Sequence, residues 1–202
     1  MRSRNPDLNA ERRQAILDAA AACFVRQGFH ATSMKDICAE AGMSPGTLYH
    51  YVQSKADIIA GIIDNQASFS RALIEPLTKP TGFQKALFDA LDHLALEIAD
   101  RDLVLNAEIG AELLRQPSLR ERAAEAERTS QRTLAAAIAA ALDQGAIRPD
   151  LDPDDTAALL LALIDGTLWR ATLNGSAHFA AALPAMKAAI SRILSESEDG
   201  DP

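Results

Sequence analysis

Apolar residues recur at helical spacing through most of the chain. Ile16, Ala20 and Phe24 fall on one face of a first helix, which Asn9 is suited to cap and Gly28 to end. No stretch shows the strict alternation of apolar and polar positions that marks a half-buried strand. Alanine and leucine, both good helix formers, dominate the composition. The pattern therefore predicts an all-α chain of about nine helices.

Two short helices are expected directly after the first. One begins at Thr32 or Ser33 and ends at Gly42. The next opens at Ser44, with Pro45 at the first helical position, where the missing N–H costs nothing. Each spans about two turns, below the roughly 12 to 15 residues at which an isolated helix is even marginal in water. Both must therefore be held by packing against the first helix.

Longer helices are expected further along the chain. Their predicted ranges are 53–75, 82–100, 102–116, 118–144, 153–173 and 178–195. Residues 196–202 are polar and acidic, as in a disordered tail. We therefore expect an N-terminal domain over residues 1–54, with its two short helices at about 33–52, and a helical C-terminal domain over residues 55–195.

The charge is unevenly distributed. The net charge is −8 and the sequence pI about 5.0, values that by themselves argue against a nucleic-acid partner. Residues 1–55 nevertheless contain seven Lys and Arg against five Asp and Glu, a balance of +2, so the remainder carries −10. Any DNA-binding surface must therefore lie in the N-terminal quarter.

Two short helices joined by a tight turn with a glycine are typical of a helix-turn-helix, whose second helix enters the major groove. Pro45 and Gly46 keep the first turn of that helix slim, so that its backbone can approach DNA closely. Ser44 and Thr47 carry hydroxyl groups suited to phosphates or base edges. Two packed helices without DNA-binding activity are the alternative interpretation.

Behind this turn, Tyr49 and His50 suit phosphates rather than sequence reading. Lys55, together with the free N–H groups at the start of the following helix, is expected to complete a phosphate clamp.

The stretch from Ile16 to Ile58 resembles the DNA-binding domain of TetR-type bacterial transcriptional repressors. The similarity rests on ILDAA, GF, T-S-M-x-x-I, AGMS, GTLYHY and SK at fixed spacing. Val52 departs from the usual Phe, and Cys38 from the commoner Ala. The resemblance implies an all-helical homodimer whose C-terminal domain binds an inducer and dimerises through its last two long helices. It places the DNA contacts at Ser33, Met34, Ser44, Pro45, Gly46, Thr47, Tyr49, His50, Tyr51 and Lys55.

The last two predicted helices also indicate a subunit interface. The helix at 153–173 is apolar on nearly all sides and the helix at 178–195 carries a strong apolar face, so both must be buried. Two such helices from each chain would form a four-helix bundle with two-fold symmetry. The alternative is one long internal core within a single chain.

The sequence says little about the ligand. Most small-molecule sites have apolar walls with few polar groups, which suggests a largely apolar inducer. The candidates on the fourth to eighth helices are Phe69, Phe83, Phe88, His93, Glu108, Glu112 and Trp169.

Other classes of function find no support in the sequence. There is no catalytic or phosphate-binding motif, so we expect no enzyme and no cofactor. The four histidines lack metal-ligand spacing, and Cys23 and Cys38 are more consistent with core packing than with a redox switch. No window has 18 to 20 consecutive apolar residues, so a cytoplasmic protein is expected.

The favoured hypothesis is a repressor that a small-molecule inducer releases from a palindromic operator. The alternative is a TetR-like DNA-binding protein whose C-terminal domain recognises another protein.

Overall fold

A computed structural model describes residues 6–79 and 82–195, and within these residues the chain is helical without strands. The predicted tail at 196–202 lies outside the described residues. The helices are α1 (Pro6–Gln27), α2 (Met34–Glu40), α3 (Pro45–Tyr51), α4 (Lys55–Ile74), the 3-10 helix η1 (Glu75–Thr78), α5 (Phe83–Glu97), α6 (Asp100–Arg115), α7 (Pro117–Asp143), α8 (Pro153–Asn174) and α9 (Ala177–Leu194). The all-α prediction is confirmed.

The largest differences from the predicted helix boundaries are at the start of α1 and at the break between α5 and α6. Helix α1 begins at Pro6, three residues before Asn9, since a proline is well suited to a first helical turn. The break between α5 and α6 falls at 98–99 rather than at 101. There the side chain of Asp102 accepts a hydrogen bond from the N–H of Ala99 at 3.0 Å, which satisfies a free donor at the start of α6.

The described residues divide into two compact units, 6–66 with 104–124, and 67–79 and 82–103 with 125–195. The division differs from the predicted boundary at 54–55, because the first parts of α4 and α7 and most of α6 join the N-terminal helices. The guanidinium of Arg122 on α7, for example, donates to both oxygens of Asp64 on α4, at 2.8 and 2.5 Å. Such contacts between distant segments leave no mark on local sequence patterns.

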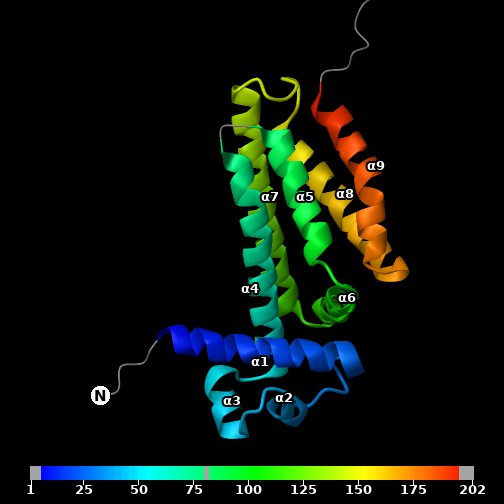
Figure 1. The fold of residues 1–202 in the computed structure, drawn as a ribbon. Coiled ribbons are helices and arrows are strands. Elements are labelled where there is room, and N and C mark those ends of the chain that lie inside the picture. The colour runs from blue at the N-terminus through cyan, green and yellow to red at the C-terminus, as the bar shows by residue number, and fades with distance from the viewer. Residues whose placement is uncertain (1–5, 80–81, 196–202) are drawn as a thin grey trace, which may run out of the picture. The chain divides into compact units, whose positions relative to one another are not determined.

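In the first unit, α1 lies across α2 and α3 and packs against both (Figure 1). Ile16 and Phe24 of α1, Ile37 of α2 and Leu48 of α3 are almost completely buried. Burying a side chain of this size stabilises the fold by about 1.5 to 3 kcal/mol. The two short helices are therefore held by α1, as their length predicts.

In the second unit, α8 and α9 lie side by side and run in opposite directions, and α5 packs against α9 (Figure 1). The fully buried side chains that join these helices and α7 include Leu91, Ile138, Leu160, Phe179 and Ile190. The turn between α8 and α9 is fixed by Asp100, whose carboxylate accepts a hydrogen bond from the N–H of Ser176 at 2.6 Å.

Helix α8 has an unusually apolar surface. By length and composition it could cross a membrane, yet only 22% of its most apolar window is buried within the chain. Leu159, Trp169 and Leu173 are exposed, Trp169 by 62% and Leu173 by 70%. An exposed apolar face of this kind is typical of a surface that binds another protein chain.

Candidate nucleic-acid interface

The start of α2 is fixed by a reciprocal cap. The hydroxyl of Ser33 accepts a hydrogen bond from the N–H of Asp36 at 3.2 Å, and the carboxylate of Asp36 accepts from the N–H and hydroxyl of Ser33 at 2.8 and 2.7 Å. These hydrogen bonds lower the pKa of the Asp36 carboxyl group. Thr32, the other predicted cap, is buried instead and donates to the carbonyl of Gly28 at 2.8 Å.

The turn between α2 and α3 requires a glycine. Gly42 has φ of +62°, in the left-handed region that other residues rarely adopt. The N–H of Met43 then donates to the carbonyl of Cys38 at 3.0 Å and closes α2. This geometry positions Ser44 to begin α3.

Helix α3 presents its first turn to solvent. Ser44 caps the helix by accepting from the N–H of Thr47 at 3.2 Å, and the two hydroxyl groups lie 2.9 Å apart. Six of the predicted DNA contacts in and beside α3 are exposed: Ser44, Pro45, Gly46, Thr47, Tyr49 and His50. The structure therefore brings these predicted residues together on one accessible surface, while Leu48 faces the core.

The end of α3 lies at the edge of the core. Tyr51 is half-buried, and its ring packs edge-on against His50 with centroids 5.1 Å apart. Val52, at the position where Phe is usual, ends α3 in an extended conformation and is completely buried. At the start of α2, Ser33 is exposed and Met34 half-buried.

Lys55 does not extend a free ammonium group toward solvent, as a phosphate clamp would require. Its Nζ donates to the carbonyl of Phe29 at 2.6 Å and to that of Thr32 at 2.8 Å. The ammonium also lies 4.3 Å from the centre of the Phe29 ring. Lys55 therefore binds the turn between α1 and α2.

Glu108 and Glu112 likewise differ from their predicted place among the ligand candidates. The carboxylate of Glu108 accepts from the N–H of Phe29 at 2.8 Å, and that of Glu112, only 2% exposed, lies 2.9 Å from Nε2 of His30. Both belong to the first unit, whereas the other five candidates belong to the second. A buried carboxylate needs hydrogen-bond donors. Arg115 of α6 and the adjoining Gln116 donate to the Glu112 carboxylate at 3.0 and 2.9 Å, and His30 of the α1–α2 turn lies beside it.

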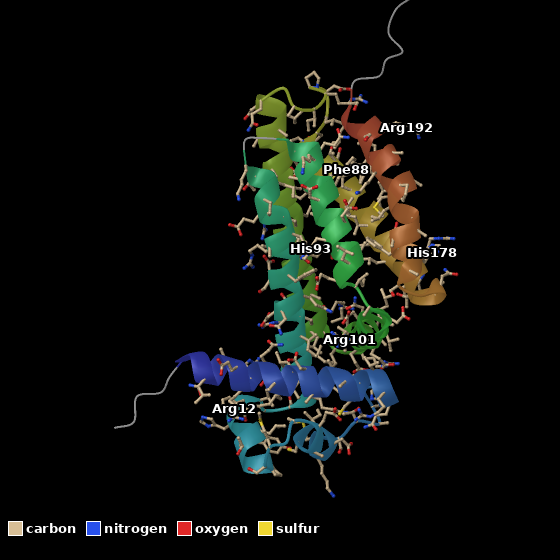
Figure 2. All side chains as sticks on the ribbon, in the orientation of Figure 1. Arg12, Phe88, His93, Arg101, His178 and Arg192 are labelled. Atoms are coloured by element: carbon tan, nitrogen blue, oxygen red, sulfur yellow. The ribbon has the colours of Figure 1, made fainter. Side chains whose placement is uncertain are left out.

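The remaining ligand candidates lie in different surroundings within the second unit. Phe83 is only 3% exposed and fills the core of the second unit, while Trp169 is exposed on α8. Phe88 and His93 both come from α5 (Figure 2). The ring of His93 lies 6.4 Å from that of Phe69 on α4, and the Phe88 ring lies beneath the ammonium of Lys187.

Both cysteines are buried, as core packing predicts. Burial raises the pKa of the Cys23 thiol, although Arg26 donates a hydrogen bond to its sulfur at 3.4 Å. We expect the native thiols to react with a thiol reagent on the order of tenfold or more slowly than the same thiols in guanidinium chloride. Stopped-flow measurements on the single variants Cys23→Ala and Cys38→Ala separate the two rates. Equal rates in the folded and unfolded chains would contradict the prediction.

Comparison with known proteins decides the family. Residues 16–62 match "Bacterial regulatory proteins, tetR family", and residues 86–195 match "BetI-type transcriptional repressor, C-terminal". The chain belongs to the TetR family. Members are DNA-binding regulators and not enzymes, so the chain is a helix-turn-helix transcriptional regulator of the repressor type.

Relatives from several bacteria support this assignment. The TetR-family regulator UidR of Escherichia coli (strain K12) is 34% identical over 92% of this chain and 94% of its own. The repressor KstR2 of Mycobacterium tuberculosis (strain ATCC 25618 / H37Rv) is 29% identical over 78% of each chain. The solved structure of Salmonella enterica GusR is 30% identical, covers 96% of this chain and 99% of its own, and superposes with a TM-score of 0.78.

Proposed function

We propose that this TetR-family regulator represses transcription by binding a palindromic operator through α3, and that a largely apolar small molecule releases it. The observation that carries the proposal is the exposed first turn of α3. Its hydroxyl groups and slim backbone face outward, while Leu48 and Val52 anchor its other side. A helix held in this way can enter a major groove without rearranging the core.

The proposed contacts divide into two chemical kinds. Ser44 and Thr47 offer hydroxyl groups to base edges or phosphates, and the adjoining Pro45 and Gly46 allow close approach. Tyr49 and His50 are proposed to bind phosphates on the flank, with Tyr51 beside them. Ser33 and Met34, at the start of α2, are proposed to contact the sugar-phosphate backbone of the DNA nearby.

This division predicts different effects for two variants. Thr47→Ala removes a group that reads bases and should change the preference at particular positions of the operator. Tyr49→Phe removes a hydroxyl group that donates a hydrogen bond to a phosphate. It should therefore weaken binding to every duplex by a similar amount, about 0.5 to 1.5 kcal/mol. Binding-site selection from a random duplex pool, followed by titration of matched and mismatched duplexes, measures both effects. A uniform loss from both variants would contradict the division of roles.

We propose that the functional unit is a homodimer joined through α8 and α9. Members of the family form dimers. The exposed apolar side chains of α8 lie along one face with Ala162 and Gly166 between them, and small residues and Pro184 are exposed on α9. A four-helix bundle would bury this surface and hold the two α3 helices about 34 to 36 Å apart, one turn of DNA.

For the inducer we propose a chemical class, a largely apolar small molecule. TetR-family regulators bind small molecules, and solved neighbours hold ligands as different as stearoyl-CoA and choline. Because those neighbours are 20% and 24% identical to this chain, their similarity extends to the fold alone. The apolar core of the second unit supports a largely apolar inducer. When bound, the inducer would favour a dimer state in which the spacing of the two α3 helices no longer matches the operator. The regulator is proposed to act in the cytoplasm.

The proposal is tested by measuring operator release. A library of apolar metabolites added to the protein bound to its selected duplex should include a compound that dissociates the complex without unfolding the protein. Release by a protein partner, with no response to any small molecule, would contradict the inducer and favour the alternative.

A further inference from the structure

The segment that carries the helix-turn-helix contains few cations. Between residues 28 and 55 the only lysines and arginines are Lys35 and Lys55. Lys35 is exposed on the first turn of α2, next to Met34, and among the described residues its ammonium makes no ion pair. Lys35 is therefore exposed to solvent, whereas the ammonium of Lys55 is bound to backbone carbonyls of the protein.

Lys55 is committed to the turn between α1 and α2. An ammonium group has three N–H donors, and two of them bind the backbone carbonyls of Phe29 and Thr32 while the group also rests on the Phe29 ring. Turning Lys55 toward a phosphate would leave both carbonyls without that donor. Such a loss makes the turn less well defined.

The same turn is held from α6. Glu108 accepts the N–H of Phe29, so both the N–H and the carbonyl of this residue are bound by charged side chains from other helices. Glu112 binds the adjacent His30. The aromatic ring of Phe29 is meanwhile buried against Phe24 of α1, with centroids 5.3 Å apart.

The position of this turn determines where α2 begins. Thr32, whose carbonyl Lys55 binds, directly precedes Ser33, the residue that caps α2 and starts the DNA-facing surface. Only one residue therefore separates the last point of attachment from the first helical residue, Met34. A shift of the turn would move this end of the surface as well.

We propose that Lys55 and Glu108 are positioning residues for operator binding: they hold the α1–α2 turn in place, and Lys55 does not itself bind a phosphate. This inference rests on the proposed operator-binding function. Lys35, the exposed lysine of the same segment, is instead free to contact a phosphate.

The test is a salt titration of binding to the selected operator duplex. Each lost phosphate contact lowers the slope of log K against log salt by about 0.9. Lys55→Met keeps the aliphatic stem over Phe29, and we expect it to weaken binding by about tenfold with no change of slope. Lys35→Ala should lower the slope by up to that amount, and Lys85→Ala on α5 should leave both affinity and slope unchanged. A slope that falls by about 0.9 in Lys55→Met overturns the proposal.

Glu108 gives an independent measurement, which also serves if Lys55→Met does not fold. Glu108→Gln keeps an oxygen acceptor for the Phe29 N–H and should retain operator affinity, whereas Glu108→Ala should weaken it by about tenfold with the slope unchanged. Circular dichroism establishes that both variants are folded at the temperature of the titration. Equal affinities of the folded Ala and Gln variants overturn the proposal. Absence of specific binding by the unaltered protein would instead refute the operator-binding function itself.

Discussion

Replacing Gly46 with alanine is expected to stabilise the folded chain and to weaken operator binding. A glycine inside a helix costs roughly 0.5 to 1 kcal/mol relative to alanine. A Cβ added at Gly46 meets no atom of the chain within 4 Å, and its φ is not positive. The fold therefore does not require a glycine there. The proposed complex does, because the backbone of this turn must come close to DNA, and the extra methyl group should reduce operator affinity by about tenfold or more.

The two effects have opposite signs, so they are easily separated. Thermal unfolding gives the stability, and titration of the selected operator duplex gives the affinity. Gly110→Ala is the matched control, since Gly110 also lies in a helix and an added Cβ meets nothing within 4 Å. It should gain stability with unchanged binding. Unaltered operator affinity in Gly46→Ala would show that the first turn of α3 does not approach the DNA.

Replacing Ala162 with arginine is expected to separate the proposed dimer and thereby abolish tight operator binding. Ala162 lies on the exposed apolar face of α8, between Leu159 and Trp169. An arginine there would place an unpaired charge in the buried interface, which is strongly unfavourable. A monomer binds one half-site at a time, so the affinity for the full palindrome should fall by about 10²-fold or more.

Sedimentation velocity measures the dimer, and titration of the full palindrome measures the binding. Ala136→Arg supplies the control, because Ala136 is an exposed alanine on α7, outside the α8 and α9 surface. It should remain dimeric and bind normally. A fully dimeric Ala162→Arg variant would place the subunit interface elsewhere on the chain.

Local sequence signals predicted the helix-turn-helix well. Ser33 and Ser44 lie where their hydroxyl groups can accept an N–H three residues on, and Gly42 supplies the positive φ of the turn, so each signal depends only on near neighbours. The burial of Leu48 likewise follows from its place opposite the exposed positions of α3. These features could be predicted because their causes lie within about four residues.

The parts that were missed depend on contacts between distant segments. Phe29 and Glu108 are separated by 79 residues and Lys55 and Phe29 by 26, so neither hydrogen bond has a local signature. The sequence places Trp169 among the ligand candidates, whereas its exposure on α8 fits a subunit interface. A charged residue on a helix has the same sequence pattern whether it binds phosphate, ligand or a nearby turn.

The most direct measurement of the central claim is a footprint of the protein on the DNA that flanks its own gene, repeated over a range of salt concentrations. We expect protection of a palindrome whose half-site centres lie about 34 to 36 Å apart, or a multiple of that spacing. The protection should weaken steeply as salt increases, because each neutralised phosphate contributes about 0.9 to the slope. If no sequence is protected better than bulk DNA at any salt concentration, the chain is not an operator-binding repressor of the kind proposed.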